Sequence, residues 1–147
     1  MFRHILVPTD GSPLSEKAVR QAVSFAKGSG ARLTFFYAAP DEFSSILGEG
    51  DLLRSIDPQL LAGAIARHVE EVLGRARAIA EAEGMPCELS SVVADDPYEA
   101  IVAASESKGC DLILMASHGR RGISGMLLGS QTQKVLTHSK IPVLVYR

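Results

Sequence analysis

A glycine-rich stretch from Ser117 to Ser130 carries the strongest chemical signal in the sequence. Glycine lets backbone N–H groups approach a phosphate with no Cβ in the way. Residues 130–133 read as a capping box, so a helix is expected to open where the stretch ends. That helix would add free N–H groups and the positive end of its dipole, and the Ser130 hydroxyl can donate to a phosphate oxygen. The stretch therefore predicts a phosphate-binding loop.

This loop differs from the two best-known phosphate-binding motifs. No GxxxxGK[ST] occurs, which excludes a Walker A loop. The first three glycines are spaced by three and follow the fourth expected strand, which does not fit the dinucleotide fingerprint. His118 lies in the loop, but a lone loop histidine is more often solvated than a general base. Arg120 and Arg121 form a charge pair that is either solvated or within reach of outer phosphates.

A second candidate group, Asp10, follows the apolar run at residues 5–7. An aspartate there can be a turn residue that only stabilises Gly11. At the carboxyl end of a central strand it can instead face a ligand, and this reading is favoured. The remaining histidines have no partners at metal-ligand spacing, so no metal site built by the chain is expected. They are His4, His68 and His138.

The elements that would position these groups alternate between strands and helices. Continuous apolar runs predict strands at residues 5–7, 33–39, 87–93, 112–116 and 141–146. Helical spacing predicts helices that begin after the caps Ser12, Asp96 and Ser130, and a long helix that begins at Pro58. Helix ends are expected at Gly28 with Gly30, at Gly84 with Pro86, and at Gly109. Residues 41–57 are expected to form a loop.

This order of elements predicts the α/β class, a single doubly wound five-stranded parallel sheet with helices on both faces. The 147 residues fit one Rossmann-like domain, residues 1–147. Ligands of such sheets bind outside the carboxyl ends of the strands, at the topological switch point. Residues 8–12, 94–96 and 117–130 follow strand ends and are candidates for that place.

Composition excludes several classes of function. The formal net charge is -2, so no bulk attraction to nucleic acid or to an anionic membrane is expected. The apolar run at the N-terminus is too short for a signal peptide or a membrane span. Cys87 and Cys110 form neither a CxxC pair nor a metal-ligand spacing and suggest a reducing compartment. A cytoplasmic protein is the expectation.

Three stretches together resemble the universal stress protein family, of the UspA-like, ATP-binding subgroup. That subgroup carries G-x2-G-x9-G-[ST] after its fourth strand, and this chain has Ala116-x2-Gly119-x9-Gly129-Ser130. Residues 4–12 resemble the first strand and turn of the family, and residues 140–145 its last strand. The resemblance implies the fold of the adenine nucleotide alpha hydrolases.

Ala116 departs from the motif, which has glycine at this position. If the position needs a positive φ, alanine would cost about 1 kcal/mol or somewhat more. If it only has to be small, alanine is almost neutral. The place of Ala116 at the end of an apolar strand favours the second explanation.

The resemblance implies a set of residues around ATP, or around AMP or ADP, with Mg²⁺ on the phosphates. Asp10 would approach the ribose or the metal, and the backbone of Ala38 would meet the adenine. Phosphates would lie between residues 117–119 and 129–131, with Arg120 in reach of the outer ones. The implied residues are Pro8, Thr9, Asp10, Ala38, Met115, Ala116, Ser117, His118, Gly119, Arg120, Gly129, Ser130 and Gln131.

Three hypotheses for function follow. The first is a regulatory nucleotide-binding protein of the stress response, because no convincing catalytic set is present. The second is a slow Mg²⁺-dependent ATPase or phosphotransferase that uses Asp10. The third is a nucleotide-free interaction module, since the resemblance implies homodimers joined through Val143–Tyr146, an apolar strand at the edge of the expected sheet.

Overall fold

The computed structural model describes residues 1–41, 57–119 and 128–147. They form a parallel five-stranded sheet in the order β3-β2-β1-β4-β5. Every neighbouring pair of strands is parallel, and β1 lies at the centre. The strands are β1 (His4–Pro8), β2 (Arg32–Ala39), β3 (Glu88–Val93), β4 (Leu112–Ala116) and β5 (Val143–Tyr146).

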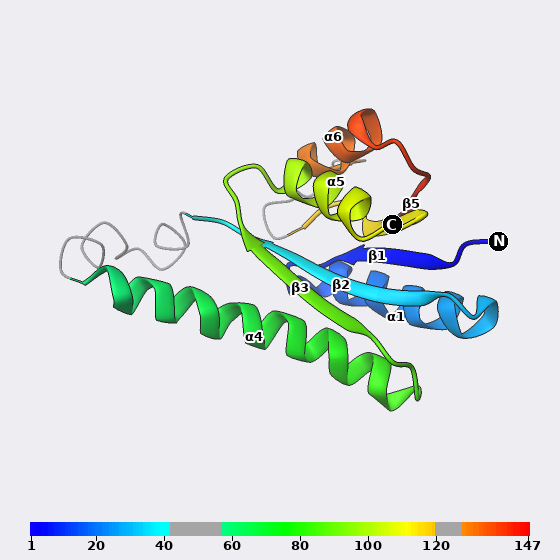
Figure 1. Ribbon diagram of the computed structural model, residues 1–147, viewed down its shortest axis with the longest axis horizontal. Helices are drawn as coiled ribbons and strands as arrows, with labels where there is room; N and C mark the ends of the chain where they lie inside the picture. Colours follow the sequence, from blue (N-terminus) through cyan, green and yellow to red (C-terminus); the bar gives the residue numbers. More distant parts are fainter. Residues whose placement is uncertain (42–56, 120–127) are drawn as a thin grey trace.

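Helices cover both faces of the sheet, as Figure 1 shows. On one face lie α1 (Pro13–Ser29) and α4 (Pro58–Ala82), which pack against each other. On the other lie α5 (Pro97–Ser107) and α6 (Ser130–His138). The predicted doubly wound, Rossmann-like fold is therefore confirmed. The expected loop at 41–57 falls almost wholly on residues 42–56, outside the described residues.

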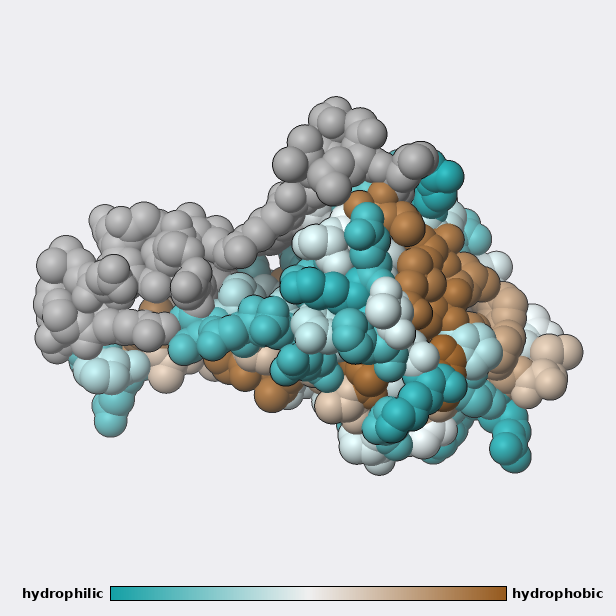
Figure 2. Space-filling model, turned by 90° about the horizontal axis from the view of Figure 1, so that it is seen from above, coloured by the Kyte–Doolittle hydropathy of each residue, from teal (hydrophilic) through white to brown (hydrophobic). Residues whose placement is uncertain are grey.

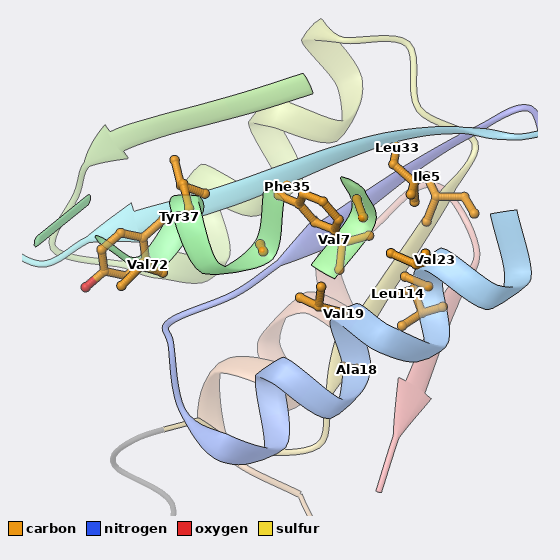
Figure 3. Close-up of a cluster of buried hydrophobic side chains, with 14 of the residues drawn as sticks. Ile5, Val7, Ala18, Val19, Val23, Leu33, Phe35, Tyr37, Val72 and Leu114 are labelled. Atoms are coloured by element: carbon orange, nitrogen blue, oxygen red, sulfur yellow. The ribbon is translucent and has the colours of Figure 1, made fainter. Parts of the chain in front are cut away.

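Two hydrophobic clusters, one on each face, hold these layers together. In β1, Ile5 and Val7 face the α1 and α4 layer, where Val7 lies beside Phe35 of β2 and Ile5 beside Leu33 (Figure 3). Leu6 faces the opposite way, into the cluster under α5 and α6. Successive side chains of a strand point to opposite faces, so a strand covered on both sides must be apolar throughout. Burying one large aliphatic side chain contributes roughly 1.5–3 kcal/mol.

Several helix ends differ from the sequence prediction by one or a few residues. Gly28 lies inside α1, and Gly30 ends that helix with a φ of 74°. The last helix has Gly129, not Ser130, at its N-cap, and Ser130 is the first helical residue. Gly129 takes an extended backbone, and its carbonyl accepts from the Gln133 N–H at 3.0 Å. The carbonyl that starts the hydrogen-bond ladder thus belongs to the glycine, which moves the cap back by one residue.

The amino ends of the strands are joined by side-chain hydrogen bonds around His4, which is buried. Arg32 Nη2 lies 3.1 Å from His4 Nδ1, and Thr34 Oγ1 lies 2.8 Å from His4 Nε2. Arginine only donates hydrogen bonds, so Nδ1 must accept and the proton must reside on Nε2. Glu88 of β3 lies beyond Thr34 at 3.5 Å. Asp111, just before β4, accepts from the N–H groups of Arg3 and His4 at 2.9 Å each.

None of the helices among the described residues is long and apolar enough to cross a membrane.

Candidate functional site

The switch point of the sheet lies between β1 and β4. From β1 the chain passes through α1 to β2 on one side, and from β4 it passes through α6 to β5 on the other. The segments that leave these two strands therefore start side by side and separate. Ligands of open parallel sheets bind at such a place, and the region between residues 9–12 and residues 117–119 with 128–131 is called the crevice below. Hydrogen bonds carry the sheet into both segments: Thr9 N–H donates to the Phe36 carbonyl at 2.9 Å, and Ser117 N–H to the Tyr146 carbonyl at 2.7 Å.

Asp10 lies on the β1 side of this crevice, where its carboxylate contacts both its own turn and the facing loop. Its Oδ1 accepts from the Ser12 N–H at 2.9 Å, which is an aspartate turn ahead of α1. Its carboxylate also lies directly against Gly119 on the β4 side, because a Cβ added to Gly119 would collide with Asp10 Oδ2. The two readings of Asp10 from sequence are thus compatible, since the turn holds the carboxylate at the mouth of the loop.

The glycine-rich loop is closed at its base. Gly129 N–H donates to the Ser117 carbonyl at 2.7 Å, and Thr132 Oγ1 donates to the Ala116 carbonyl at 3.0 Å. A Cβ on Gly129 would lie 3.0 Å from His118 Cβ and 3.1 Å from His118 Cα. Such contacts are tighter than real Cβ atoms normally make, so any side chain at position 129 would have to displace His118, and the close approach of the two loop ends favours glycine there. Two glycines of the motif are therefore explained by packing within the protein, before any ligand is considered.

Ala116 fits its position without strain. No non-glycine residue among the described ones has a positive φ, and Ala116 is buried as the last residue of β4. The explanation that this position only has to be small is therefore the one that agrees with the structure. Alanine in place of the motif's glycine leaves the base of the loop intact.

The first turn of α6 supplies backbone donors beside the closed base of the loop. The first N–H groups of any helix have no partner within it. No acceptor among the described residues pairs with the N–H groups of Ser130, Gln131 or Thr132. Ser130 is exposed, and the positive end of the α6 dipole lies here. This part of the site is suited to an anion.

The other predicted residues lie at the same end of the sheet with varied exposure. The Thr9 hydroxyl lies 3.1 Å from Ser15 Oγ at the start of α1. Ala38 is half-buried near the end of β2, on the α5 side. Arg120 lies outside the described residues. The buried members of the set are Pro8, Thr9, Met115, Ala116 and Ser117.

His118 is half-buried and its Nδ1 lies 3.0 Å from Ser117 Oγ. The two residues are neighbours in sequence, so this contact orders the loop and does not by itself form a nucleophile and base pair. No group of three or more His, Cys, Asp or Glu among the residues described could hold a metal ion. Cys110 precedes β4, at the opposite end of that strand from the glycine-rich loop. Burial raises the pKa of its thiol to about 11.

Sequence reasoning missed one residue contact of the site. The side chain of Gln131 does not face the loop: its Oε1 accepts from the Tyr98 N–H at 2.9 Å. Asp96, the expected cap of α5, makes no side-chain cap bond, and Gln131 takes its place. Only the tertiary packing of α5 on α6 reveals this contact, because nothing in the local sequence links positions 33 residues apart.

The strand order and the paired segments at the switch point define a doubly wound α/β protein of the Rossmann-like class. Comparison with known proteins gives the family. The model of the universal stress protein family matches residues 1–147, and the chain belongs to that family. A universal stress protein of Thermus aquaticus is 32% identical over 150 residues, with both chains covered completely.

Two solved structures show the same relationship in three dimensions. UspA from Lactobacillus plantarum superposes with a TM-score of 0.75 at 27% identity, over 99% of this chain and 97% of that one. A universal stress protein in complex with cAMP superposes with a TM-score of 0.67 at 28% identity, over 99% and 97% of the two chains.

Proposed function

We propose that residues 1–147 act as one domain that binds an adenine nucleotide, ATP with Mg²⁺, in the crevice between the β1 and β4 segments, as a regulatory protein of the stress response. One observation carries the proposal. Asp10, the closed base of the glycine-rich loop and the free N–H groups of α6 converge at the switch point. The relative that was solved with cAMP supports an adenine nucleotide as the ligand class.

The chemistry of the donors fits a nucleotide. The N–H groups of Ser130 and Gln131 would hold phosphate oxygens, with the Ser130 hydroxyl as a further donor. The carboxylate of Asp10 would repel a phosphate in the crevice that carries no metal ion. Asp10 would therefore face the ribose hydroxyls or a Mg²⁺ ion on the phosphates. Bound Mg²⁺ would neutralise phosphate charge, and its ligands from the protein would come from Asp10 alone among the described residues of the crevice.

Calorimetry with Mg²⁺ and ATP tests the proposal on protein stripped of carried-over nucleotide. We expect a Kd well below about 1 mM, and an affinity of about 1 mM or weaker would contradict the proposal. Ser130→Asp is the informative variant, because an acidic residue in the first turn favours the helix while it repels phosphate. It should lower the affinity at least about tenfold without loss of stability. Ser24→Asp on the exposed side of α1 is the matched control and should bind as the wild type does.

Slow hydrolysis remains a measurable outcome of the same experiment. Release of inorganic phosphate that depends on Mg²⁺ and disappears in Asp10→Ala would add an ATPase activity to the binding function. Turnover unchanged by that substitution would remove Asp10 from any catalytic role.

A second proposed function, self-association through β5, rests on the exposed edge of the sheet. β5 pairs only with β4 among the described strands, and Leu144 is 38% exposed. Figure 2 looks onto the α5 and α6 side and shows apolar surface gathered in one continuous area beside polar surface. Open apolar edges recruit a further strand. We expect a homodimer by light scattering at micromolar concentration, and Leu144→Lys should shift it to a monomer, whereas Thr137→Lys on α6 should not.

A further inference from the structure

The first turn of α5 has one backbone donor that its own segment leaves without an acceptor. Pro97 has no N–H, and the Glu99 N–H donates to the Asp96 carbonyl at 3.2 Å. The Asp96 side chain makes no cap bond. The Tyr98 N–H is therefore the donor that needs an acceptor from elsewhere, since an unpaired, half-buried backbone N–H is unfavourable.

Gln131 supplies that acceptor from a different helix. Its Oε1 lies 2.9 Å from Tyr98 N, and its own place is the second position of α6. The two helices are held in register next to this bond, because the Tyr98 ring lies 5.0 Å from the His138 ring and 5.1 Å from Lys134 Nζ. Gln131 thus has its backbone N–H at the crevice and its side chain on the start of α5.

We propose that Gln131 is a positioning residue that couples occupancy of the crevice to the first turn of α5. The proposal rests on the proposed nucleotide binding. A phosphate that binds the N–H groups of Ser130 and Gln131 fixes the first turn of α6. The Gln131 side chain is then held at the Tyr98 N–H, and the first turn of α5 unfolds locally less often. Coupling of this kind is reciprocal, so a firm α5 start also favours the ligand.

Amide exchange of Tyr98, followed by NMR on the full chain, tests the cap without ligand. Gln131→Met keeps the length of the side chain and removes the acceptor, and it should speed exchange about fivefold. Gln131→Glu restores an acceptor and should return exchange to the wild-type rate, which a merely structural loss of volume does not explain. Gln133→Met, on the exposed side of the same helix, is the control and should leave the Tyr98 rate unchanged.

The same signal with saturating ATP and Mg²⁺ tests the coupling. In the wild type, ATP should slow Tyr98 exchange about fivefold, and in Gln131→Met it should not. If the Tyr98 amide exchanges at the same rate in ligand-free wild type and in Gln131→Met, Gln131 does not cap α5. ATP that calorimetry shows to be bound, but that leaves Tyr98 exchange unchanged in the wild type, overturns the coupling while the proposed function stands. If calorimetry shows no ATP binding, the proposed function and the coupling both fail. Calorimetry alone identifies this outcome, whatever the exchange rate of Tyr98.

Discussion

The two ends of the parallel sheet are built in opposite ways. At the amino end, side chains satisfy one another: His4 is enclosed between Arg32 and Thr34, and Asp111 accepts two backbone N–H groups. At the carboxyl end, the Gly129 N–H and the Thr132 hydroxyl close the base of the glycine-rich loop, and the N–H groups of the first α6 turn have no acceptor among the described residues.

This difference separates stability from binding. A polar network whose members are paired around a buried histidine fixes one arrangement of the strands and leaves few groups to offer a ligand. Glycines and helix N–H groups leave a space and unpaired donors, which is what an anion needs. Substitutions at the carboxyl end should therefore change affinity, with or without a change in unfolding, whereas substitutions at the amino end should change unfolding alone.

Gly129→Val should have the largest effect. The added side chain would press on the backbone of His118 and part the two ends of the loop, so the α6 donors would leave the crevice. We expect nucleotide affinity by calorimetry to fall about a hundredfold or more. Gly74→Ala in α4, where a Cβ meets nothing within 4 Å, is the control and should bind normally. Near-normal affinity of Gly129→Val would mean that closure of the loop base does not matter for binding.

Gly119→Ala should act through Asp10. A Cβ there collides with the Asp10 carboxylate, and forced overpacking should lower the unfolding free energy by about 1–2 kcal/mol in urea titrations. In an Asp10→Ala background the same substitution should be almost neutral. Additive effects of the two substitutions would show that the pair does not interact.

Asp111→Ala should test the amino end. The Asp111 carboxyl is partly desolvated, which opposes ionisation, yet the N–H groups of His4 and Arg3 lower its pKa. Loss of these hydrogen bonds should lower the unfolding free energy at pH 7 by about 1 kcal/mol, with nucleotide affinity unchanged. Asp95→Ala, an exposed aspartate after β3, should leave the urea midpoint in place. A loss of affinity without a loss of stability in Asp111→Ala would break the division between the two ends.

The pH dependence of His4 should have the smallest effect. Burial and the neighbouring Arg32 guanidinium lower the pKa of His4 below its ordinary value of 6.5, against the opposing carboxylates of Glu88 and Asp111. As the pH falls, His4 therefore takes up its proton in the unfolded chain before it does so in the folded one. The contribution of His4 is complete above pH 6.5 and is lost as the pH falls through the lower pKa of the folded state.

The slope from one histidine is at most about 1.4 kcal/mol per pH unit, and the integrated change should stay below that over the window. Urea titrations between pH 7 and pH 5 measure it. His4→Gln keeps a donor and an acceptor without titrating and should flatten the curve, whereas His138→Gln on the surface should not. If the unfolding free energy of His4→Gln depends on pH as steeply as that of the wild type, His4 is not the source of the pH dependence.

Local patterns were sufficient to predict the fold. The runs at residues 5–7 and 112–116 are apolar throughout because both faces of central strands are covered, and such runs are visible in sequence. The meeting of Asp10 with the glycine-rich loop was predictable too, because parallel strands bring their carboxyl ends to one edge. The role of Ala116 required the backbone angle, which no composition reveals.

Contacts between distant side chains were beyond the sequence. The pattern gave His4 no partner at metal-ligand spacing, and the structure gives it hydrogen-bond partners 28 and 30 residues away. The cap of α5 was expected from the adjacent Asp96 and comes from Gln131, which lies 33 residues after Tyr98, the residue that it caps. Pairings of this kind depend on how whole elements pack, and only then on residue type.

The contact between Asp10 and Gly119 also constrains how this chain can diverge. While an aspartate occupies position 10, a side chain at position 119 should be disfavoured, because the Asp10 carboxylate must shift to admit it. A lineage that first shortens residue 10 frees position 119, whereas the reverse order passes through a destabilised intermediate. The two positions, 109 residues apart by their numbers, should therefore evolve as an epistatic pair with a preferred sequence of changes.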